Sequence, residues 1–557
     1  MRVGSAIGLF PCRVMEWLRR MTAQERLREA IDQETARLRA YVPSDREAAL
    51  AALLHARDRP PWKPDAGPKT EHVTDRRRVD LGGNMALGFC LESSGTGSSD
   101  GSDLSRPASD LTDWGQRFLR ECGQVAEAEN VLAHCDSGFM RLVEQGDGSF
   151  DAWIATRRAP ASWREREDID WWADWLARRH TPELRELELE LRAACDDPGR
   201  DAMYQRIASV HVETMAYQLG YPPDAVIGGS TVRTYRAVLE RLIAWALAER
   251  DRGEMPSPRS EVALVSAIAN GLGVVTDCVA SAVSALTLDR EGAAYHAAVP
   301  GVAAAPLVRF DSDRVVWSIH GLLTEPLLFL TREQRRRDPE AYHNTAHERE
   351  TVFREDLYGI FGNKRFVTSA GRIKLRRTDG DIRTDIDAVV FDRKTGTLGL
   401  FELKSQDPFA RSAAELTRQR DNVLYANRQV GGALDWVKRH GADEILGRID
   451  SRAAKTFRVQ RVLPFVLGRY LVHFGDGPEP DRRAAWGTWP QVLRLLDGRP
   501  ARAADANPLA SLFTLLTNDA PLARTSDDAV TREVMIGAIR LTVHASYAAF
   551  QTSAAGG

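Results

Sequence analysis

Apolar residues recur at helical spacing through most of the first 300 residues. Residues 15–57 are rich in Arg, Glu, Ala and Leu at this spacing, and they end at the proline-marked stretch ARDRPPWKPD. Residues 113–300 show the helical pattern throughout, and Ser230 or Thr231 is the expected N-cap of a helix in TVRTYRAVLERLIAWALAER. The pattern therefore predicts an N-terminal all-helical region.

The pattern changes near residue 306, where PLVRF and RVVWSIHGLL look like short strands. A helix is expected next, then two strand-like runs, an amphipathic region and a further apolar strand pair, at about 339–361, 365–376, 384–404, 413–440 and 456–474. Helix, strands, helix, strand is the order of a small α/β domain. The expected fold is thus α+β and multidomain, with the helical region followed by an α/β domain that has a mixed sheet flanked by helices.

These changes divide the chain into five parts. Residues 1–65 form an N-terminal helical segment, and residues 66–112 are expected to be a flexible linker. The linker contains ESSGTGSSDGSDLSRPASD, which cannot bury enough apolar surface to order itself. Residues 113–300 then form a helical domain, residues 301–500 the α/β domain, and residues 501–557 a C-terminal helical extension.

Composition places the chain among globular proteins, with 43% hydrophobic and 27% charged residues. The formal net charge of −3 makes no global case for a nucleic-acid partner, so such a case depends on local charge. Six cysteines without a C-x-x-C motif favour a reducing, cytoplasmic location. Residues 262–286 are long enough to cross a bilayer, but Asp277 in mid-membrane would cost about 2.5–3.5 kcal/mol. A buried helix and no membrane association are therefore expected.

The chemistry is concentrated in TDIDAVVFDRKTGTLGLFELKSQ, residues 384–406. Two apolar runs flank the turn RKTG, in which Gly396 suits a positive φ. A four-residue loop pairs Asp392 with Thr397, and a two-residue loop at Lys394-Thr395 gives the same register. A three-residue loop with a bulge would instead slip the register by one residue.

In the first register Asp387 faces Glu402 and Asp385 faces Lys404. Because strand side chains alternate, Glu402 and Lys404 share one face while Leu403 takes the other. Directly opposed residues have Cβ atoms about 4.5–5.5 Å apart, so two acids placed there destabilise the pair. A hard divalent cation held by oxygen ligands would compensate. The alternative is an exposed hairpin face with an ion pair between Lys404 and Asp385.

This segment resembles the PD-(D/E)xK nuclease superfamily, which has the restriction-endonuclease-like fold. Residue by residue, Asp387 takes the place of the motif aspartate, Glu402 of the second acid and Lys404 of the lysine, while Ile386 stands where the motif has proline. The resemblance implies a catalytic site with Mg²⁺ or Mn²⁺ bound by Asp387, Glu402 and the Leu403 carbonyl. It covers about 340–475, roughly a quarter of the chain.

Members of this superfamily often add a catalytic glutamate from the helix before the hairpin. Glu355 is the candidate for that role, with Glu348 as the alternative. Some relatives carry Gln-x-x-x-Tyr in the following helix, whereas here Gln419 is followed by Tyr425 at a different spacing. That departure leaves the subgroup open.

Local charge supports a phosphate partner. Residues 361–377, FGNKRFVTSAGRIKLRR, contain no acid and six basic residues. The six candidate nucleic-acid ligands are Lys364, Arg365, Arg372, Lys374, Arg376 and Arg377. A basic run beside an acidic cluster is expected of a groove that grips a nucleic-acid backbone next to a metal site, although a charge-protected strand edge has the same pattern.

The expected function is metal-dependent hydrolysis of phosphodiester bonds, with DNA the favoured partner, in phage defence, a mobile element or repair. The alternative is a catalytically silent nuclease fold that binds nucleic acid or serves as a scaffold. In either case the N-terminal helical half is a candidate surface for a protein partner.

Two further clusters carry weaker hypotheses. His343 and His347 stand four residues apart on a predicted helix, which is a zinc-ligand spacing, but they lack the internal glutamate of H-E-x-x-H. Trp171, Trp172 and Trp175 have the composition of a base-stacking platform, yet such clusters more often form helix core.

Overall fold

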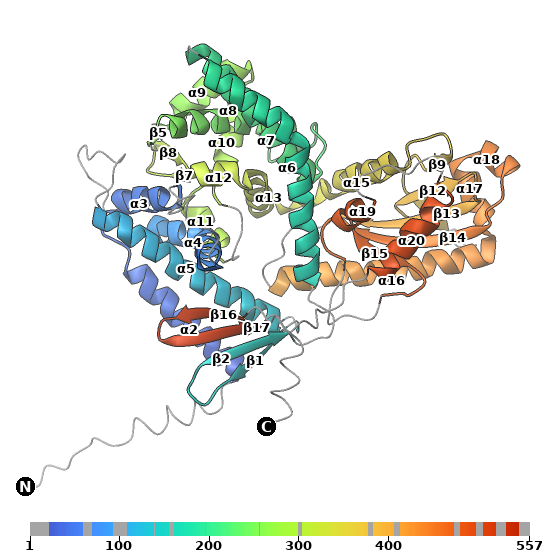
Figure 1. Ribbon diagram of the computed structural model, residues 1–557, viewed down its shortest axis with the longest axis horizontal. Helices are drawn as coiled ribbons and strands as arrows, with labels where there is room; N and C mark the ends of the chain where they lie inside the picture. The colour runs from blue at the N-terminus through green and yellow to red at the C-terminus, as the bar shows by residue number, and fades with distance from the viewer. Residues whose placement is uncertain are drawn as a thin grey trace, which may run out of the picture.

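The computed structural model describes residues 22–58, 70–92, 109–136, 138, 140–154, 161–194, 197–254, 257–298, 304–376, 382–405, 413–472, 480–496, 505–519 and 531–544. Within these ranges the protein is α+β and forms two parts (Figure 1). The helical lobe comprises residues 22–344 together with 531–544. The α/β lobe comprises residues 345–519.

The helical lobe contains thirteen of the described helices and two hydrophobic clusters. Its helices are α2 (Ala23–Ala40), α3 (Arg46–Asp58), α4 (Thr70–Glu92), α5 (Ser109–Asp136), α6 (Ala161–Ala193), α7 (Asp197–Leu219), α8 (Val232–Asp251), α9 (Glu261–Leu272), α10 (Thr276–Ala285), α11 (Arg290–Ala297), α12 (Ile319–Leu323), α13 (Pro326–Arg337) and α14 (Pro339–Asn344). Thr231, one of the two expected caps, accepts a hydrogen bond from the Thr234 amide at the start of α8. The helical character expected for this half is therefore confirmed.

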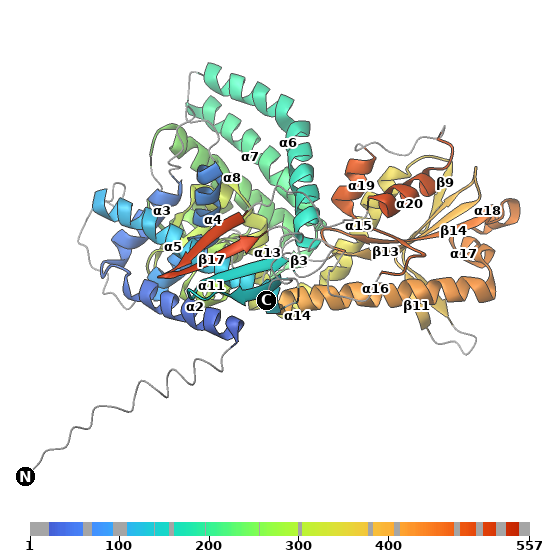
Figure 2. The same ribbon diagram turned by 60° about the horizontal axis from the view of Figure 1, so that its bottom comes forward.

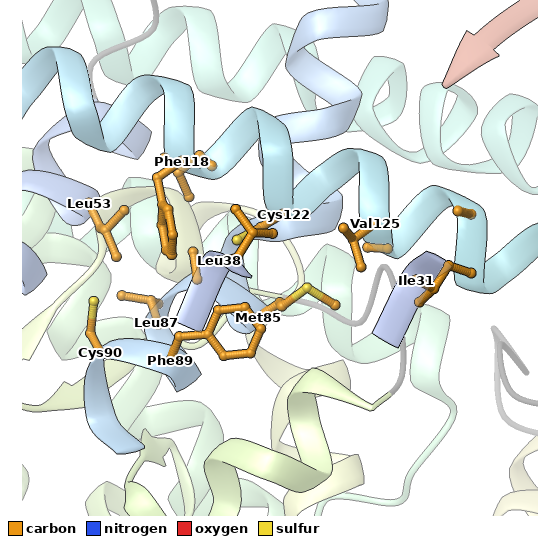
Figure 3. Packing of buried hydrophobic residues seen from close by; sticks show 14 of the residues in the cluster. Ile31, Leu38, Leu53, Met85, Leu87, Phe89, Cys90, Phe118, Cys122 and Val125 are labelled. Carbon is orange, nitrogen blue, oxygen red and sulfur yellow. The ribbon is translucent and has the colours of Figure 1, made fainter. Parts of the chain in front are cut away.

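Helix α4 overturns the flexible linker expected at 66–112. Residues 82–91 of α4 are buried, and Met85, Phe89 and Cys90 pack with Phe118 and Cys122 of α5 (Figure 3). The predicted linker included both the apolar stretch MALGFCL and the polar tract that follows it. Most of that polar tract lies outside the described residues. The central part of the expected linker is core helix.

Two glycines explain how closely α4 and α5 approach. A Cβ built on Gly82 would lie 2.4 Å from the Gly123 nitrogen, and one on Gly123 would lie 2.0 Å from the Arg78 carbonyl oxygen. Side chains at these positions would force the helices apart. Glycine is therefore required here by space, since neither residue needs a positive φ.

The first half is not all-helical, because small sheets interrupt it. Three strand groups lie in the helical lobe: a sheet of order β1-β2-β17-β16, a second of order β5-β8-β7-β6, and the short pair β3-β4. Their bounds are β1 (Met140–Glu144), β2 (Phe150–Ile154), β3 (Val226–Ile227), β4 (Ser230–Thr231), β5 (Arg259–Ser260), β6 (Thr287–Leu288), β7 (Leu307–Arg309), β8 (Arg314–Trp317), β16 (Thr531–Ile536) and β17 (Ile539–His544). The α/β part therefore begins after β7 and β8, later than the expected boundary at 301.

The C-terminal region also differs from the expected helical extension. Residues 508–518 are helical, but 531–544 form the hairpin β16–β17, and β17 pairs in parallel with β2. The chain thus returns to the helical lobe after completing the α/β lobe (Figure 1). A strand whose partner lies almost 400 residues earlier has no local signal beyond its own alternation.

The apolar stretch 262–286 forms two helices, α9 and α10. Gly273 ends α9 with φ of 63°, a left-handed conformation that suits glycine. The expectation of one buried helix is corrected to a helical hairpin that buries one face. Among the described helices, none is long and apolar enough to cross a membrane.

The α/β lobe is built on a five-stranded sheet of order β15-β14-β13-β12-β9. Strands β9 and β12 and strands β12 and β13 pair antiparallel, whereas β13–β14 and β14–β15 pair in parallel. A separate ribbon, β10–β11, precedes β12. The bounds are α15 (Ala346–Ile360), β9 (Phe366–Thr368), β10 (Ile373–Arg376), β11 (Ile382–Ile386), β12 (Ala388–Asp392), β13 (Thr397–Lys404), α16 (Ala413–His440), α17 (Ala442–Ile449), α18 (Ser451–Thr456), β14 (Arg461–Gly468), β15 (Ala485–Thr488), α19 (Trp489–Leu495) and α20 (Pro508–Asn518).

Helices cover both faces of this sheet (Figure 2). Phe401 and Leu403 of β13 pack on the side of α15, α19 and α20. Leu398 and Leu400, on alternate positions, pack on the side of α16 and α17. The alternation places Glu402 and Lys404 on the α16 side, so the expected division of faces is confirmed.

The hairpin register is also confirmed. Ala388 pairs with Phe401 and Asp392 with Thr397 across the four-residue turn, in which Gly396 has φ of 67°. The Gly396 amide donates to the Asp392 carbonyl and closes the loop. Asp387 and Glu402 therefore lie at the end of the hairpin away from the turn.

A buried arginine joins the two lobes. Arg469, directly after β14, is ion-paired with Asp356 of α15 and donates to the Tyr217 carbonyl of α7 at 2.7 Å. Its guanidinium also lies over the ring of Trp172. Trp172 is fully buried in the α/β core, so the base-stacking hypothesis for the tryptophan cluster is wrong for its central residue.

A second buried arginine fixes the hairpin turn. Arg365 donates through Nε and Nη2 to the two carboxylate oxygens of Asp392, each at 2.6 Å, and both side chains are buried. The same Asp392 accepts from the Lys394 amide and the Thr395 hydroxyl. Arg365 is thus part of the core of the fold, which corrects its expected role as a nucleic-acid ligand.

We expect Arg365→Ala to lower the free energy of unfolding by about 3–5 kcal/mol, because it leaves the buried Asp392 carboxylate without its partner. Chemical denaturation would measure the loss. Arg393→Ala, which removes an exposed arginine 3.6 Å from Asp450, should cost no more than about 1 kcal/mol. A stable Arg365→Ala protein with weakened nucleic-acid binding would restore Arg365 to the binding surface.

Candidate active site

The candidate site begins where the chain bends at Asp387. Strand β11 pairs with β10, whereas β12 pairs with β13 and β9, so the chain joins the main sheet only after Asp387. If β11 continued the pairing of β12 with β13, the Ile386 carbonyl would meet the Leu403 amide. Instead, the Asp387 carboxylate accepts that hydrogen bond through Oδ2 at 2.9 Å. The buried amide is thereby satisfied by a side chain.

Glu402 and Lys404 extend from β13 toward α16. Glu402 is 4% exposed, and Lys404 Nζ donates to its Oε1 at 2.6 Å. Lys404 also donates to Gln429 Oε1 of α16 at 3.1 Å. The three residues matched to the nuclease motif, Asp387, Glu402 and Lys404, therefore lie together at one end of the hairpin.

Gln429 connects this group to Asp385. Its Nε2 donates to Asp385 Oδ1 at 2.9 Å, while its Oε1 accepts from Lys404. Arg372 of the segment before β10 is ion-paired with the other carboxylate oxygen of Asp385 at 3.0 Å. Because β11 has left the sheet, Asp385 does not pair across from Lys404 as expected, and Gln429 lies between them.

Helix α15 supplies Glu350 in place of the expected Glu355. Arg354 donates to the Asp387 carbonyl at 3.2 Å, so its helical face is turned to the site. Glu350, one turn earlier on that face, interacts electrostatically with Asp387 and Lys404. Glu355 is exposed on another face, as is Glu348. Both sequence candidates therefore miss the carboxylate that the helix presents to the site.

Three carboxyl groups of the site have raised pKa values. Burial raises the pKa of Asp387, and Lys404 opposes the shift. Burial also raises the pKa of Glu402 well above its usual range, with a further contribution from Asp387. The pKa of Glu350 is raised by burial and then by Asp387. The common cause is desolvation of acids that repel one another.

Lys404 carries the compensating charge. Burial alone would lower its pKa, but Glu402, Asp387 and Glu350 together raise it. The lysine is therefore an ammonium ion at neutral pH. Arg372, paired with Asp385, adds a second positive charge that also acts on Asp387 and Glu350. Lys404 and Arg372 thus face four carboxyl groups, so the site has an excess of acid.

The donor set suits a hard divalent cation. Asp387 and Glu402 offer carboxylate oxygens, and the Leu403 carbonyl points to the same side as the Leu403 amide, which faces Asp387. In the described part of the chain, no three acidic, histidine or cysteine side chains are already arranged to hold a metal ion. Lys404 Nζ donates to Glu402 Oε1, so a cation that binds this oxygen would displace the lysine from it.

The basic run at 361–377 is divided between different places. Lys364 lies near the hairpin turn, at the opposite end from Asp387, where its carbonyl accepts from Arg393. Lys374 and Arg376 are exposed on β10, and Lys374 stands opposite Asp385 in the ribbon. Arg377 lies outside the described residues. Of the six expected ligands, Arg372 and Lys374 are the ones beside the carboxylates.

Sequence reasoning did not identify Gln429. It lies four residues after Tyr425, whose half-exposed ring is 5.5 Å from Lys404 Nζ. Together they form Tyr-x-x-x-Gln, the reverse order of the Gln-x-x-x-Tyr found in some nucleases. Gln419, the residue considered from sequence, is buried nearly three turns before Gln429 in the same helix. A search for the motif in both directions would have found Gln429.

His343 and His347 are exposed, as the preferred interpretation of a helix surface expects, and they do not form the alternative zinc site. His343 belongs to α14 and His347 to α15, with a break between the helices at Thr345. Both side chains are exposed, and His347 lies 3.5 Å from Glu350. The spacing of four residues therefore does not place both rings on one helix.

Comparison with known proteins assigns no family to this chain. No protein-family model, no curated protein and no solved structure matches it. The function is therefore inferred from the residues and their geometry.

We expect Asp387→Asn to raise the melting temperature by a few degrees at neutral pH in EDTA. The amide oxygen can still accept from the Leu403 amide, while an unfavourable buried charge is removed. Because the folded protein holds these site protons to higher pH than the unfolded chain, the contribution of the site carboxyls to wild-type stability should fall as pH rises from about 4 toward neutrality. The variant should show a smaller fall.

Asp421→Asn, on the exposed face of α16, provides the control. It should leave the melting temperature and the pH dependence of stability unchanged. Adding Mn²⁺ at neutral pH should then stabilise the wild type and the control more than Asp387→Asn. Equal Mn²⁺ shifts in all three proteins, measured by differential scanning fluorimetry, would contradict a cation site at Asp387.

Proposed function

We propose that the α/β lobe is a metal-dependent nuclease of the PD-(D/E)xK type, with DNA as the favoured substrate. The observation that carries this proposal is the group of buried Asp387 and Glu402 with half-buried Glu350 and Lys404. Together with Asp385, its carboxyl groups outnumber the two cations Lys404 and Arg372. Structural ion pairs are normally balanced. A cluster of buried acids with raised pKa values is more typical of a functional site.

The surrounding fold agrees with the resemblance. The sheet is mixed and has helices on both faces, the aspartate stands at one end of a hairpin strand, and the E-x-K sequence ends the next strand. The second D/E-x-K in the chain, Asp392-Arg393-Lys394, lies in the turn, where Asp392 is engaged by Arg365. The two tripeptides are thus distinguished by their surroundings.

The residues suit phosphodiester hydrolysis in separate roles. A divalent cation, when bound, would polarise the phosphate and activate water. Asp387 and Glu402 would hold it, and Arg354 and the Leu403 amide position Asp387. Gln429 orients Lys404 through a direct hydrogen bond.

Lys404 is suited to stabilise negative charge. An ammonium group has only donors, and here its raised pKa keeps it charged, so it can donate to a phosphate oxygen but cannot accept a proton from water. Glu350 is the better proton acceptor, because burial and Asp387 raise its pKa while Glu402 would be engaged by the cation. Lys404 is therefore assigned to charge stabilisation and Glu350 to proton transfer.

A catalytically silent nuclease fold is the second candidate. The short contact between Lys404 and Glu402 favours it, because the lysine already neutralises one of the two expected metal ligands. In that case the lobe would bind nucleic acid or serve as a scaffold without cutting. The two candidates differ in whether cation binding and cleavage occur.

Cleavage assays on linear, circular and single-stranded DNA, and on RNA, with Mg²⁺, Mn²⁺ or EDTA, test the proposal. We expect metal-dependent cleavage by the wild type and a loss of at least about 100-fold in Lys404→Ala, since a preorganised charge contributes about this much to rate. Lys394→Ala should retain activity, as it alters the lysine of the other D/E-x-K tripeptide.

A second pair of variants separates the two helix glutamates. Glu350→Gln should reduce cleavage, whereas Glu355→Gln should not, because only Glu350 interacts with Asp387 and Lys404. Cleavage that survives Lys404→Ala in a folded protein would rule out the proposed roles. Absence of cleavage and of cation binding in the wild type would favour the silent fold.

A further inference from the structure

A second basic surface lies at the opposite end of the α/β lobe from the carboxylates. Residues 438–461 contain three acids and seven basic residues, a net charge of +4 within a chain of net charge −3. The seven, called here the basic end, are Lys438, Arg439, Arg448, Arg452, Lys455, Arg458 and Arg461. All seven are exposed.

The basic end is formed by the end of α16, by α17 and α18, and by the start of β14 (Figure 2). Its position is set by the hairpin turn, because the Gln460 and Arg461 amides both approach the Gly396 carbonyl. Lys404 and Asp387 lie at the other end of the same hairpin. Ten residues of α16 separate Gln429 from Arg439, which corresponds to about 15 Å.

Much of this positive charge is not neutralised within the protein. Among the described residues, Lys438, Arg439, Lys455 and Arg461 form no ion pair. Asp450, one of the three acids, is occupied in capping α18 through the Arg452 and Ala453 amides. Surface charge that serves only solubility is usually interspersed with the opposite sign. A surface with one sign in excess is suited to a polyanion.

Basic side chains connect the two ends of the lobe. Arg372 is paired with Asp385 at the site, and Lys374 stands opposite Asp385 in the ribbon. Arg448 of the basic end donates to the Lys374 carbonyl at 3.1 Å. A phosphate backbone could therefore follow positive charge from the carboxylates over the ribbon to the basic end.

We propose that the basic end anchors the backbone of duplex DNA whose scissile phosphate lies at the carboxylate site. The proposal rests on the proposed nuclease function for its substrate. Duplex is favoured over single strands because the basic end has none of the large exposed apolar side chains on which bases stack. The same lack disfavours a membrane surface, which normally takes an apolar face as well as positive charge.

The separation predicts dependence on duplex length. DNA rises 3.4 Å per base pair, so about 15 Å corresponds to four or five base pairs beyond the site. A six-base-pair duplex centred on the carboxylates would stop short of the basic end, whereas a 24-base-pair duplex would cover it.

The test measures binding of both duplexes to the full chain in EDTA by fluorescence anisotropy. The short duplex is closed by non-nucleotide linkers so that it stays paired. The variant carries Lys438→Ala, Arg439→Ala, Arg452→Ala and Lys455→Ala. A control with the same loss of charge carries Arg178→Ala, Arg185→Ala, Arg192→Ala and Arg290→Ala, all exposed in the helical lobe.

We expect the variant to bind the 24-base-pair duplex at least tenfold more weakly than the control, and the six-base-pair duplex equally. The slope of log affinity against log salt should become less negative by about one for each phosphate contact removed. Equal binding by variant and control, an equal loss for both lengths, or no length dependence in the wild type would overturn the anchor.

Two further arms distinguish other partners and separate this proposal from the nuclease. The basic-end variant is also tested for binding to duplex RNA and to vesicles of anionic phosphatidylserine. Loss of binding to either of these, with unchanged binding to duplex DNA, would also overturn the anchor. Cleavage by the wild type, lost in Lys404→Ala, tests the nuclease alone. Length-dependent DNA binding that requires the basic end, in a protein that never cleaves, would uphold the basic end as an anchor for duplex DNA and reject cleavage at the carboxylates.

Discussion

The hydrogen bond from the Leu403 amide to the Asp387 carboxylate holds the candidate site together. It forms because the chain turns out of the sheet at Asp387 and takes away the carbonyl that the amide would otherwise meet. A buried amide needs an acceptor, so an acidic side chain is kept beside Glu402 where water is scarce. That placement raises the pKa values of both acids and makes Lys404 an ammonium ion. The bend thus produces the excess of acid on which the proposed chemistry rests.

The helical lobe also contacts the end of the sheet that carries Lys404. The Arg469 amide donates to the Lys404 carbonyl at 2.8 Å, and its guanidinium reaches α7, α15 and Trp172 of α6. A buried guanidinium with partners on several helices resists displacement, because each lost partner leaves an unpaired charge. The strand end that carries Lys404 is therefore tied to both lobes. The role of the long helical segment, which the sequence left open, includes this support.

Local features of the site were predictable, whereas features that depend on distant partners were not. The turn around Gly396 and the two-residue alternation were enough to place Asp387 beside Glu402 and to put Lys404 on the same face. Gln429 and Glu350 were missed because each comes from a helix, and helical spacing does not specify which face turns to the sheet. The buried state of Arg365 depends on Asp392, and the β17 strand depends on β2, so neither could be derived from neighbouring residues.

The most direct test of a cation site at Asp387 and Glu402 is an anomalous difference map from a crystal of the full chain soaked in Mn²⁺. The account predicts a peak within coordination distance of both carboxylates and the Leu403 carbonyl, with Lys404 moved away from Glu402. A map without a peak there, and with Lys404 still bonded to Glu402, would show that the lysine is the permanent partner of these acids and would contradict the metal site.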